Sequence, residues 1–223
     1  MAGAAASGTK AKIVGAAMQL FWEHGYERTS IADLVAAAGV RSGSLYHFFS
    51  TKEDVLTAVL EAYLGGLTPQ VMEPAFASVA DPVERIFAVL AGYRERILMT
   101  EFRYRCPVGS LALEMQNASE RGRELVRQNF AGWRAAIAQC VRDAAPALRD
   151  GVDPDSLATF VLTVMEGGVM QATAERAIER YDDSVQHLRA YVASLRRAAE
   201  RERTRKPLTH TTTAARRQGE RST

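Results

Sequence analysis

The sequence predicts an all-α protein, with a helix-turn-helix head of three helices and a larger helical body. Apolar residues recur at intervals of three and four along most of the chain, and no run alternates apolar with polar residues as a strand would. Prolines and glycines separate these periodic segments into helices. We expect a flexible arm over residues 1–8, the head over 9–52, the body over 53–203 and a disordered basic tail over 204–223. Three short helices bury too little to be stable alone, so the head should pack on the body.

Residues 29–52 predict two helices joined by a tight turn. Thr29 or Ser30 can cap the first helix. Gly39 follows its last apolar residue, where a left-handed turn favours glycine. Ser42 can cap the second helix, whose outward residues would be Arg41, Ser42, Ser44, Tyr46 and His47. In a helix-turn-helix the second helix enters the DNA major groove, so this pattern predicts double-stranded DNA as a partner.

Several segments together resemble the TetR family of bacterial regulators: Leu20-Phe21, Gly25-Tyr26, Thr29-Ser30, the run from Ala38 to Phe49, and Lys52-Glu53-Asp54. The resemblance is strong over residues 9–60 and extends further only in helical layout. The resemblance implies that Tyr46, His47 and Lys52 contact DNA phosphates. It also implies that four residues lie close to the edges of the bases: Arg41, Ser42, Gly43 and Ser44. Arg41 stands where the family commonly has serine, and it can make a bidentate contact to guanine. We add Thr29 and Ser30 to the predicted DNA-binding site.

Each of these residues also has a purely structural interpretation. Tyr46 can be a half-buried core tyrosine, which is compatible with a phosphate contact. His47 can be an ordinary surface histidine, and Lys52 a solvated lysine in the first turn of its helix.

The last two helices of the body are the predicted dimer interface. Asp153-Pro154 opens a helix that is apolar on more than one face, so it needs cover on two sides. In the TetR family the final two helices of each subunit form a four-helix bundle. A homodimer suits a palindromic operator with half-sites roughly 34–36 Å apart. The alternative is that residues 154–195 only close the core of the monomer. The predicted interface comprises Leu157, Val161, Val164, Gly168, Leu188, Tyr191 and Leu195.

A cysteine-proline pair marks the predicted effector site. Pro107 suits the first position of a helix, which places Cys106 at the helix N-terminus near Arg103 and Arg105. That environment predicts a lowered thiol pKa and high reactivity. The Cys-Pro-x-Gly stretch also resembles a TetR branch that senses electrophiles. The alternative is a small buried core residue. With Cys106, the predicted pocket for an apolar or electrophilic effector comprises Phe102, Tyr104, Phe130, Trp133 and Met165.

Charge is unevenly distributed along the chain. Residues 1–52 hold five basic and three acidic side chains, and residues 196–223 hold nine and three. Because the whole chain has a net charge of +2, the segment between them is acidic. A basic head on an acidic body suits a protein that meets DNA at one end. The basic tail can add nonspecific DNA affinity or have no role.

Other classes of protein find little support in the sequence. We expect no transmembrane segment, no signal peptide and, with two cysteines, a reducing cytoplasm. No histidine has a sequence context that ties it to Cys106 as an enzyme's base, and no metal-ligand or cofactor motif is present. The sequence therefore predicts a dimeric repressor released from its operator by a small molecule, and not an enzyme. The alternative is a helical protein-interaction module without specific DNA binding.

Overall fold

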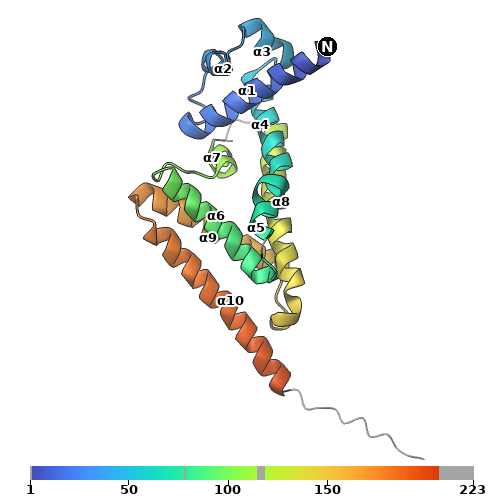
Figure 1. The fold of residues 1–223 in the computed structure, drawn as a ribbon, viewed down its shortest axis with the longest axis vertical. Coiled ribbons are helices and arrows are strands. Elements are labelled where there is room, and N and C mark those ends of the chain that lie inside the picture. Colours follow the sequence, from blue (N-terminus) through green and yellow to red (C-terminus); the bar gives the residue numbers. More distant parts are fainter. Residues whose placement is uncertain (1, 78, 115–118, 206–223) are drawn as a thin grey trace, which may run out of the picture.

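The computed structural model describes residues 2–77, 79–114 and 119–205, and within those ranges the chain is helical without a strand (Figure 1). The predicted all-α class is confirmed. The helices are α1 (Ala2–His24), α2 (Ile31–Ala38), α3 (Ser42–Phe48), α4 (Lys52–Leu67), α5 (Glu73–Phe76), α6 (Pro82–Met99), α7 (Pro107–Leu113), α8 (Glu120–Asp143), α9 (Pro154–Glu175) and α10 (Glu179–Arg205). A π-helical turn (Thr68–Met72) precedes α5, and a 3-10 turn (Ala145–Ala147) follows α8.

The head consists of α1, α2 and α3, and it lies at one end of the molecule on the start of α4 (Figure 1). The expected flexible arm over residues 1–8 is wrong for residues 2–8, because α1 already begins at Ala2. The first residues are mainly alanine, which has the highest helix propensity of all residues, so the chain can extend the helix through them.

Two apolar clusters organise the core. One lies in the body and is built from α6, α8, α9 and α10. The other joins the head to α4, α7 and the start of α8, and its buried residues include Phe21, Leu45, Leu56 and Leu111. The core of the head therefore extends beyond residue 52, the expected end of that domain, and continues into α4 and α7.

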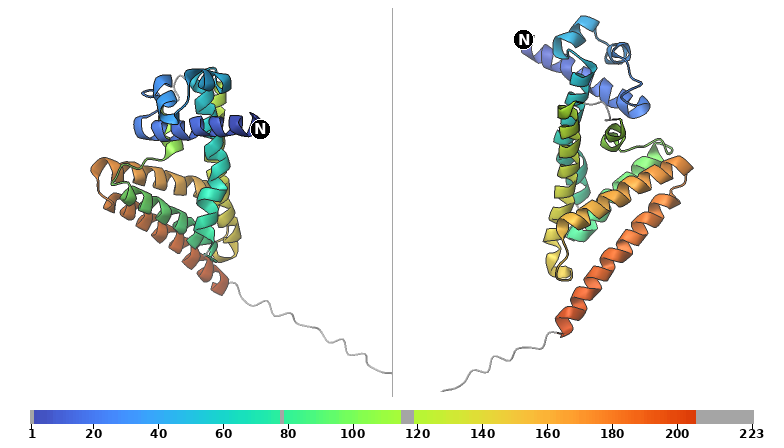
Figure 2. Two further views of the ribbon diagram at one scale, coloured as in Figure 1. Left: turned by 45° about the horizontal axis from the view of Figure 1, so that its top comes forward. Right: turned by 180° about the vertical axis from the view of Figure 1, so that it is seen from behind.

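The body is a layered arrangement of long helices. Helix α4 lies beside α8, while α9 packs on both α8 and α10, an arrangement that the two views of Figure 2 share. Helix α10 ends at Arg205, at the end of the molecule remote from the head (Figure 1). Residues 204 and 205 are therefore helical, whereas the rest of the predicted tail lies outside the described residues.

Among the described helices, α9 alone is long and apolar enough by composition to cross a membrane. The sequence had not predicted such a helix. Small and apolar residues give an 18-residue stretch of this helix a mean hydropathy of 1.2, and 44% of that stretch is buried inside the protein. Because α9 packs between α8 and α10, its apolar character is accounted for in part by the body's core.

Candidate functional site

Local caps fix the geometry of the helix-turn-helix. The Ser30 hydroxyl accepts a hydrogen bond from the Asp33 amide at 3.1 Å, and the Asp33 carboxylate accepts one from the Ser30 amide at 2.8 Å. The bonds from Ser30 lower the pKa of Asp33. Gly39 ends α2 with φ +62°, a left-handed conformation that glycine adopts without strain. These contacts set the direction in which α3 leaves the turn.

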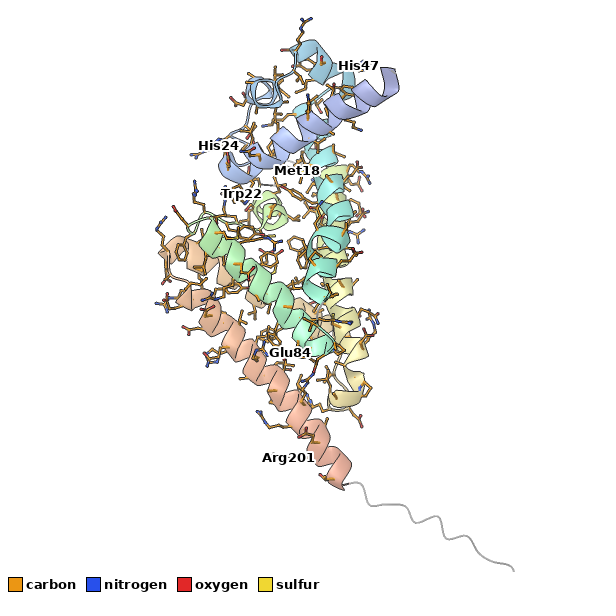
Figure 3. The ribbon with its side chains drawn as sticks, viewed as in Figure 1. Met18, Trp22, His24, His47, Glu84 and Arg201 are labelled. Atoms are coloured by element: carbon orange, nitrogen blue, oxygen red, sulfur yellow. The ribbon has the colours of Figure 1, made fainter. Side chains whose placement is uncertain are left out.

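Helix α3 presents polar side chains to solvent on its outward side. Arg41, Ser42, Gly43, Tyr46 and His47 are exposed, and Ser44 is half-buried. Tyr46 is 54% exposed, so it is not the half-buried core tyrosine of the alternative interpretation. Arg41, not Ser42, is the N-cap residue, and its side chain makes no capping bond. The guanidinium is therefore not used by the cap. Figure 3 shows His47 at the end of the head furthest from the body.

Thr29 and Lys52 act within the head. Thr29 is 2% exposed and donates a hydrogen bond to the Gly25 carbonyl at 2.7 Å, so its place in the predicted DNA-binding site is wrong. Ser30, not Thr29, caps α2. Lys52 is half-buried, donates to the Tyr26 carbonyl at 3.1 Å, and lies 4.2 Å from the centre of the Tyr26 ring. Its role at a DNA phosphate remains a prediction.

A segment that we call the strap, residues 101–114, joins the head to the body. Arg105 donates to the Trp22 carbonyl at 2.6 Å, and the Trp22 indole donates to the Arg105 carbonyl at 3.1 Å. The Glu114 carboxylate accepts from the Glu27 amide at 2.8 Å. Figure 3 shows Trp22 on the side of α1 that faces α7. The strap therefore binds the head at two places, the C-terminal end of α1 and the turn that follows it.

The other side of the strap is fixed to α9. The Thr173 hydroxyl donates to the Tyr104 carbonyl at 2.9 Å, and the Glu166 carboxyl of α9 lies beside Cys106 and Gly109 of the strap. Glu101 and Phe102 have φ of +52° and +62°, conformations that side-chain-bearing residues rarely adopt. The strap thus contacts both the head and the body's core.

The six predicted effector residues do not form one group. Tyr104, Trp133 and Met165 are buried in the core of the body, and Phe102 packs against that cluster at the strap's turn. Cys106 belongs to the cluster shared with the head, and Phe130 packs against that cluster. Tyr93, which lay outside the predicted set, connects the rings, because its ring centre lies 5.7 Å from those of both Tyr104 and Trp133.

Cys106 caps α7 as predicted, but the expected reactive thiol is wrong. Its sulfur accepts from the Gly109 amide at 3.4 Å, and burial, together with the nearby Glu166 carboxylate, raises the pKa of the thiol. Arg103 instead bonds the Thr100 carbonyl of its own turn. The only sequence signal for Glu166 was a single acidic residue in an apolar stretch of α9.

Most of the predicted dimer interface is core. Leu157, Val161, Leu188 and Leu195 are buried in the body's cluster, and Gly168 lies against the Tyr181 ring. These apolar residue types are suitable for a dimer interface. The spacing of apolar residues along α9 and α10, however, did not indicate which side of each helix packs on its own chain. Val164 is half-buried and Tyr191 is 45% exposed, so these two remain candidates.

The exposed apolar residues on α9 and α10 form a different surface. We define the outer face as Phe160, Val164, Met170 and Tyr191, of which all but the half-buried Val164 are exposed. The Phe160 and Tyr191 rings pack edge to face with their centres 5.8 Å apart. An open hollow of about 530 Å³, whose lining includes both rings, adjoins this face and lies apart from the predicted effector residues. Within the described ranges no group of three metal-ligating side chains occurs.

Two family descriptions match this chain. "Bacterial regulatory proteins, tetR family" matches residues 13–59, which comprise the second half of α1, the whole of α2 and α3, and half of α4. "Tetracyclin repressor-like, C-terminal domain" matches residues 82–188. The first match contains all the exposed residues of α3, and the second contains the strap and α9.

Individual relatives match over most of their length. The transcriptional repressor DhaR of Mycobacterium sp. (strain GP1) is 27% identical over 74% of this chain and 82% of its own. The transcriptional regulator AcuR of Cereibacter sphaeroides is 29% identical over 73% and 75%. A crystal structure of a TetR transcriptional regulator from Chloroflexus aurantiacus superposes with a TM-score of 0.73 at 27% identity, covering 84% of this chain and 96% of the other.

Proposed function

Because this chain belongs to the TetR family of helix-turn-helix transcriptional regulators, we propose that it is a cytoplasmic homodimeric repressor with a palindromic operator. A small molecule bound in the body would release it. The observation that carries the proposal is the exposed polar surface of α3 on a head held rigidly by its caps. Repression is supported by the name of the similar repressor DhaR.

The division of roles on α3 follows from its chemistry. Arg41 has a planar guanidinium that can bind guanine through two hydrogen bonds, which would specify sequence. Tyr46 can donate a hydrogen bond from its hydroxyl to a DNA phosphate, which would position the helix without distinguishing one base sequence from another. Gly43 is exposed, and a Cβ there would touch nothing within 4 Å, so that point of α3 is open to a close approach.

The experiment that tests operator binding is fluorescence anisotropy with DNA selected from genomic fragments, over a series of salt concentrations. Arg41→Ala should weaken specific binding by about 1–3 kcal/mol and relax the preference at one base pair. Tyr46→Phe should weaken binding to all sequences alike. Arg142→Ala, on the exposed surface of α8 in the body, is the control with an equal change of charge. Equal affinity for selected and random DNA would refute the proposal and favour a protein-interaction module.

Dimerisation through the outer face is the second part of the proposal. A seven-residue recognition helix makes few base contacts, so specific affinity needs a second head. Phe160→Asp with Tyr191→Asp should yield monomers in sedimentation velocity and abolish specific DNA binding. Met99→Asp is the control, because Met99 is an exposed apolar residue at the end of α6. A dimer that survives the double substitution would refute this choice of interface.

Release by an effector is supported by the contacts between body and head. Helix α4 connects the head to α8, where Asn129 donates to the Leu60 carbonyl at 3.0 Å. The strap provides a second connection, from α9 to the end of α1. A ligand that shifts either element would change the position of the head. By thermodynamic linkage, operator DNA would then weaken ligand binding by the same factor.

A further inference from the structure

The body contains a carboxyl group whose hydrogen bonds the protein only partly satisfies. Oε1 of Glu166 is buried and has no hydrogen-bond partner among the described residues. The Cys106 side chain lies beside the same carboxyl and is buried as well. Burial raises the pKa of Glu166, which shows how poorly its surroundings solvate the charge. A buried acceptor without a donor is costly, so proteins rarely retain one without a reason.

The position of Glu166 depends on a glycine in α7. A Cβ added at Gly109 would lie 2.7 Å from Oε2 of Glu166, so a larger residue there would displace the carboxyl from its place against α7. One oxygen is therefore held against the strap, while the other has no protein donor. This arrangement leaves Oε1 as the atom that a ligand can bind.

Aromatic rings of the body's core lie near the same carboxyl. Glu166 is among the charges that raise the pKa values of both Tyr93 and Tyr104, although burial is the main cause for each. The Tyr93 ring packs at 5.7 Å from the Trp133 ring. The guanidinium of Arg96 lies 5.6 Å from the centre of the Tyr93 ring, so one of these rings already contacts a cation. Aromatic faces attract cations through their quadrupole.

We propose that Glu166 is the anchor of the effector site and that the effector is a small apolar or aromatic molecule carrying a protonated amine. This inference rests on the proposed function. An ammonium group supplies both a donor for Oε1 and a compensating charge, whereas a neutral alcohol supplies only the donor. The rings of Tyr93, Tyr104 and Trp133 would contact the apolar part of the molecule.

The same carboxyl offers a direct connection to the head. Cys106 caps α7 and lies beside Glu166, and the adjacent Arg105 holds the end of α1. An amine that draws the carboxyl toward itself would move it away from Cys106 and Gly109. The strap would then lose one of its attachments to α9, while its bonds to α1 remain.

Calorimetry on the full-length protein tests the site. The probes are benzylamine, phenethylamine and hexylamine, each paired with the alcohol of the same skeleton. At least one amine should bind about ten-fold or more tightly than its alcohol, and Glu166→Gln should remove that difference. Glu175→Gln is the control, because this exposed carboxylate on the same helix pairs with Arg180 at the surface. Circular dichroism confirms that each variant is folded.

Three results would overturn the proposal: no amine binds, amines and alcohols bind equally, or Glu166→Gln binds amines as the unchanged protein does. Gly109→Ala provides a second variant, which should weaken amine binding by displacing the carboxyl while leaving its charge. Operator affinity, measured on the same samples, separates this inference from the proposed function. Glu166-dependent amine binding without any operator binding would support the site and refute the repressor. Operator binding without amine binding would do the reverse.

Discussion

Arg105 lies at the junction of head and body, and replacing it with alanine should loosen the head while leaving the core of the body intact. Its guanidinium donates to the Trp22 carbonyl at 2.6 Å and the Glu23 carbonyl at 3.3 Å. These carbonyls end α1, where the helix dipole also favours a cation. Hydrogen bonds from a charged donor contribute about 1.5–3 kcal/mol. Because Arg105 is exposed and solvent screens its charge, we expect a smaller contribution, about 1–2 kcal/mol.

Urea unfolding followed by fluorine NMR measures this effect. A chain labelled with 5-fluorotryptophan gives one signal from Trp22, at the junction, and one from Trp133, in the body. With a denaturant dependence of about 2 kcal/mol per molar urea, Arg105→Ala should lower the Trp22 midpoint by about 0.7 M. The Trp133 midpoint should fall less, because Trp133 is buried inside the body's cluster, whereas Trp22 only packs against that cluster from α1 and bonds directly to Arg105.

Arg103→Ala is the matched control for this measurement. Arg103 is an exposed arginine of the same strap, but its guanidinium donates a hydrogen bond to the Thr100 carbonyl in its own turn. If Arg103→Ala lowers the Trp22 midpoint as much as Arg105→Ala does, the bonds to α1 do not hold the head. Equal shifts of both tryptophan signals would also refute the reasoning, because the junction and the core of the body would then unfold as one unit.

Three further predictions concern the body. Iodoacetamide should modify Cys106 at pH 7.5 far more slowly than it modifies the same cysteine in urea, because burial raises the pKa of the thiol; mass spectrometry measures both rates, and equal rates would contradict this. Asp81→Asn should cost about 0.2–1 kcal/mol at pH 7 in urea titrations, because Arg196 lowers the pKa of Asp81 below 3.8. The stability that the Asp81 carboxylate contributes is present above pH 3.8 and is lost as the pH falls through its lowered pKa. The difference in unfolding free energy between Asp81→Asn and the unchanged protein should therefore disappear at that low pH. Asn129→Ala should lower the unfolding free energy by about 1–3 kcal/mol, because it removes the two buried hydrogen bonds that its amide donates to the Leu60 and Leu125 carbonyls, whereas Gln139→Ala on the exposed side of α8 should have little effect.

The head could be predicted from sequence because its determinants are local. The capping box joins Ser30 to Asp33, three residues apart, and Gly39 supplies the left-handed turn at the end of the same helix. The spacing of apolar residues then fixes which side of α3 faces outward, since Leu45 must be buried. Such signals act within one or two helical turns and depend little on the rest of the fold.

The sites in the body depend on contacts that the sequence does not reveal. Cys106 has two arginines within three residues, which suggested a low thiol pKa, but its actual neighbour is Glu166, sixty residues further on. Thr29 and Ser30 are both suitable caps, and only the packing of α1 decides which of them is buried. A periodic apolar pattern likewise identifies residues that are buried in the folded protein. It does not indicate whether they pack against the same chain or against a second copy.

The exposed side of α9 and the short recognition helix lead to the same requirement. Seven residues of α3 extend over about 10 Å, which corresponds to roughly three base pairs. One such helix cannot specify a unique site in a genome, so specific binding requires a second head at a fixed distance. The outer face, on the body and away from the head, carries apolar side chains that remain exposed in the monomer. We infer that covering Phe160, Met170 and Tyr191 with a second copy would satisfy both demands, because it buries the apolar surface and leaves the two recognition helices free.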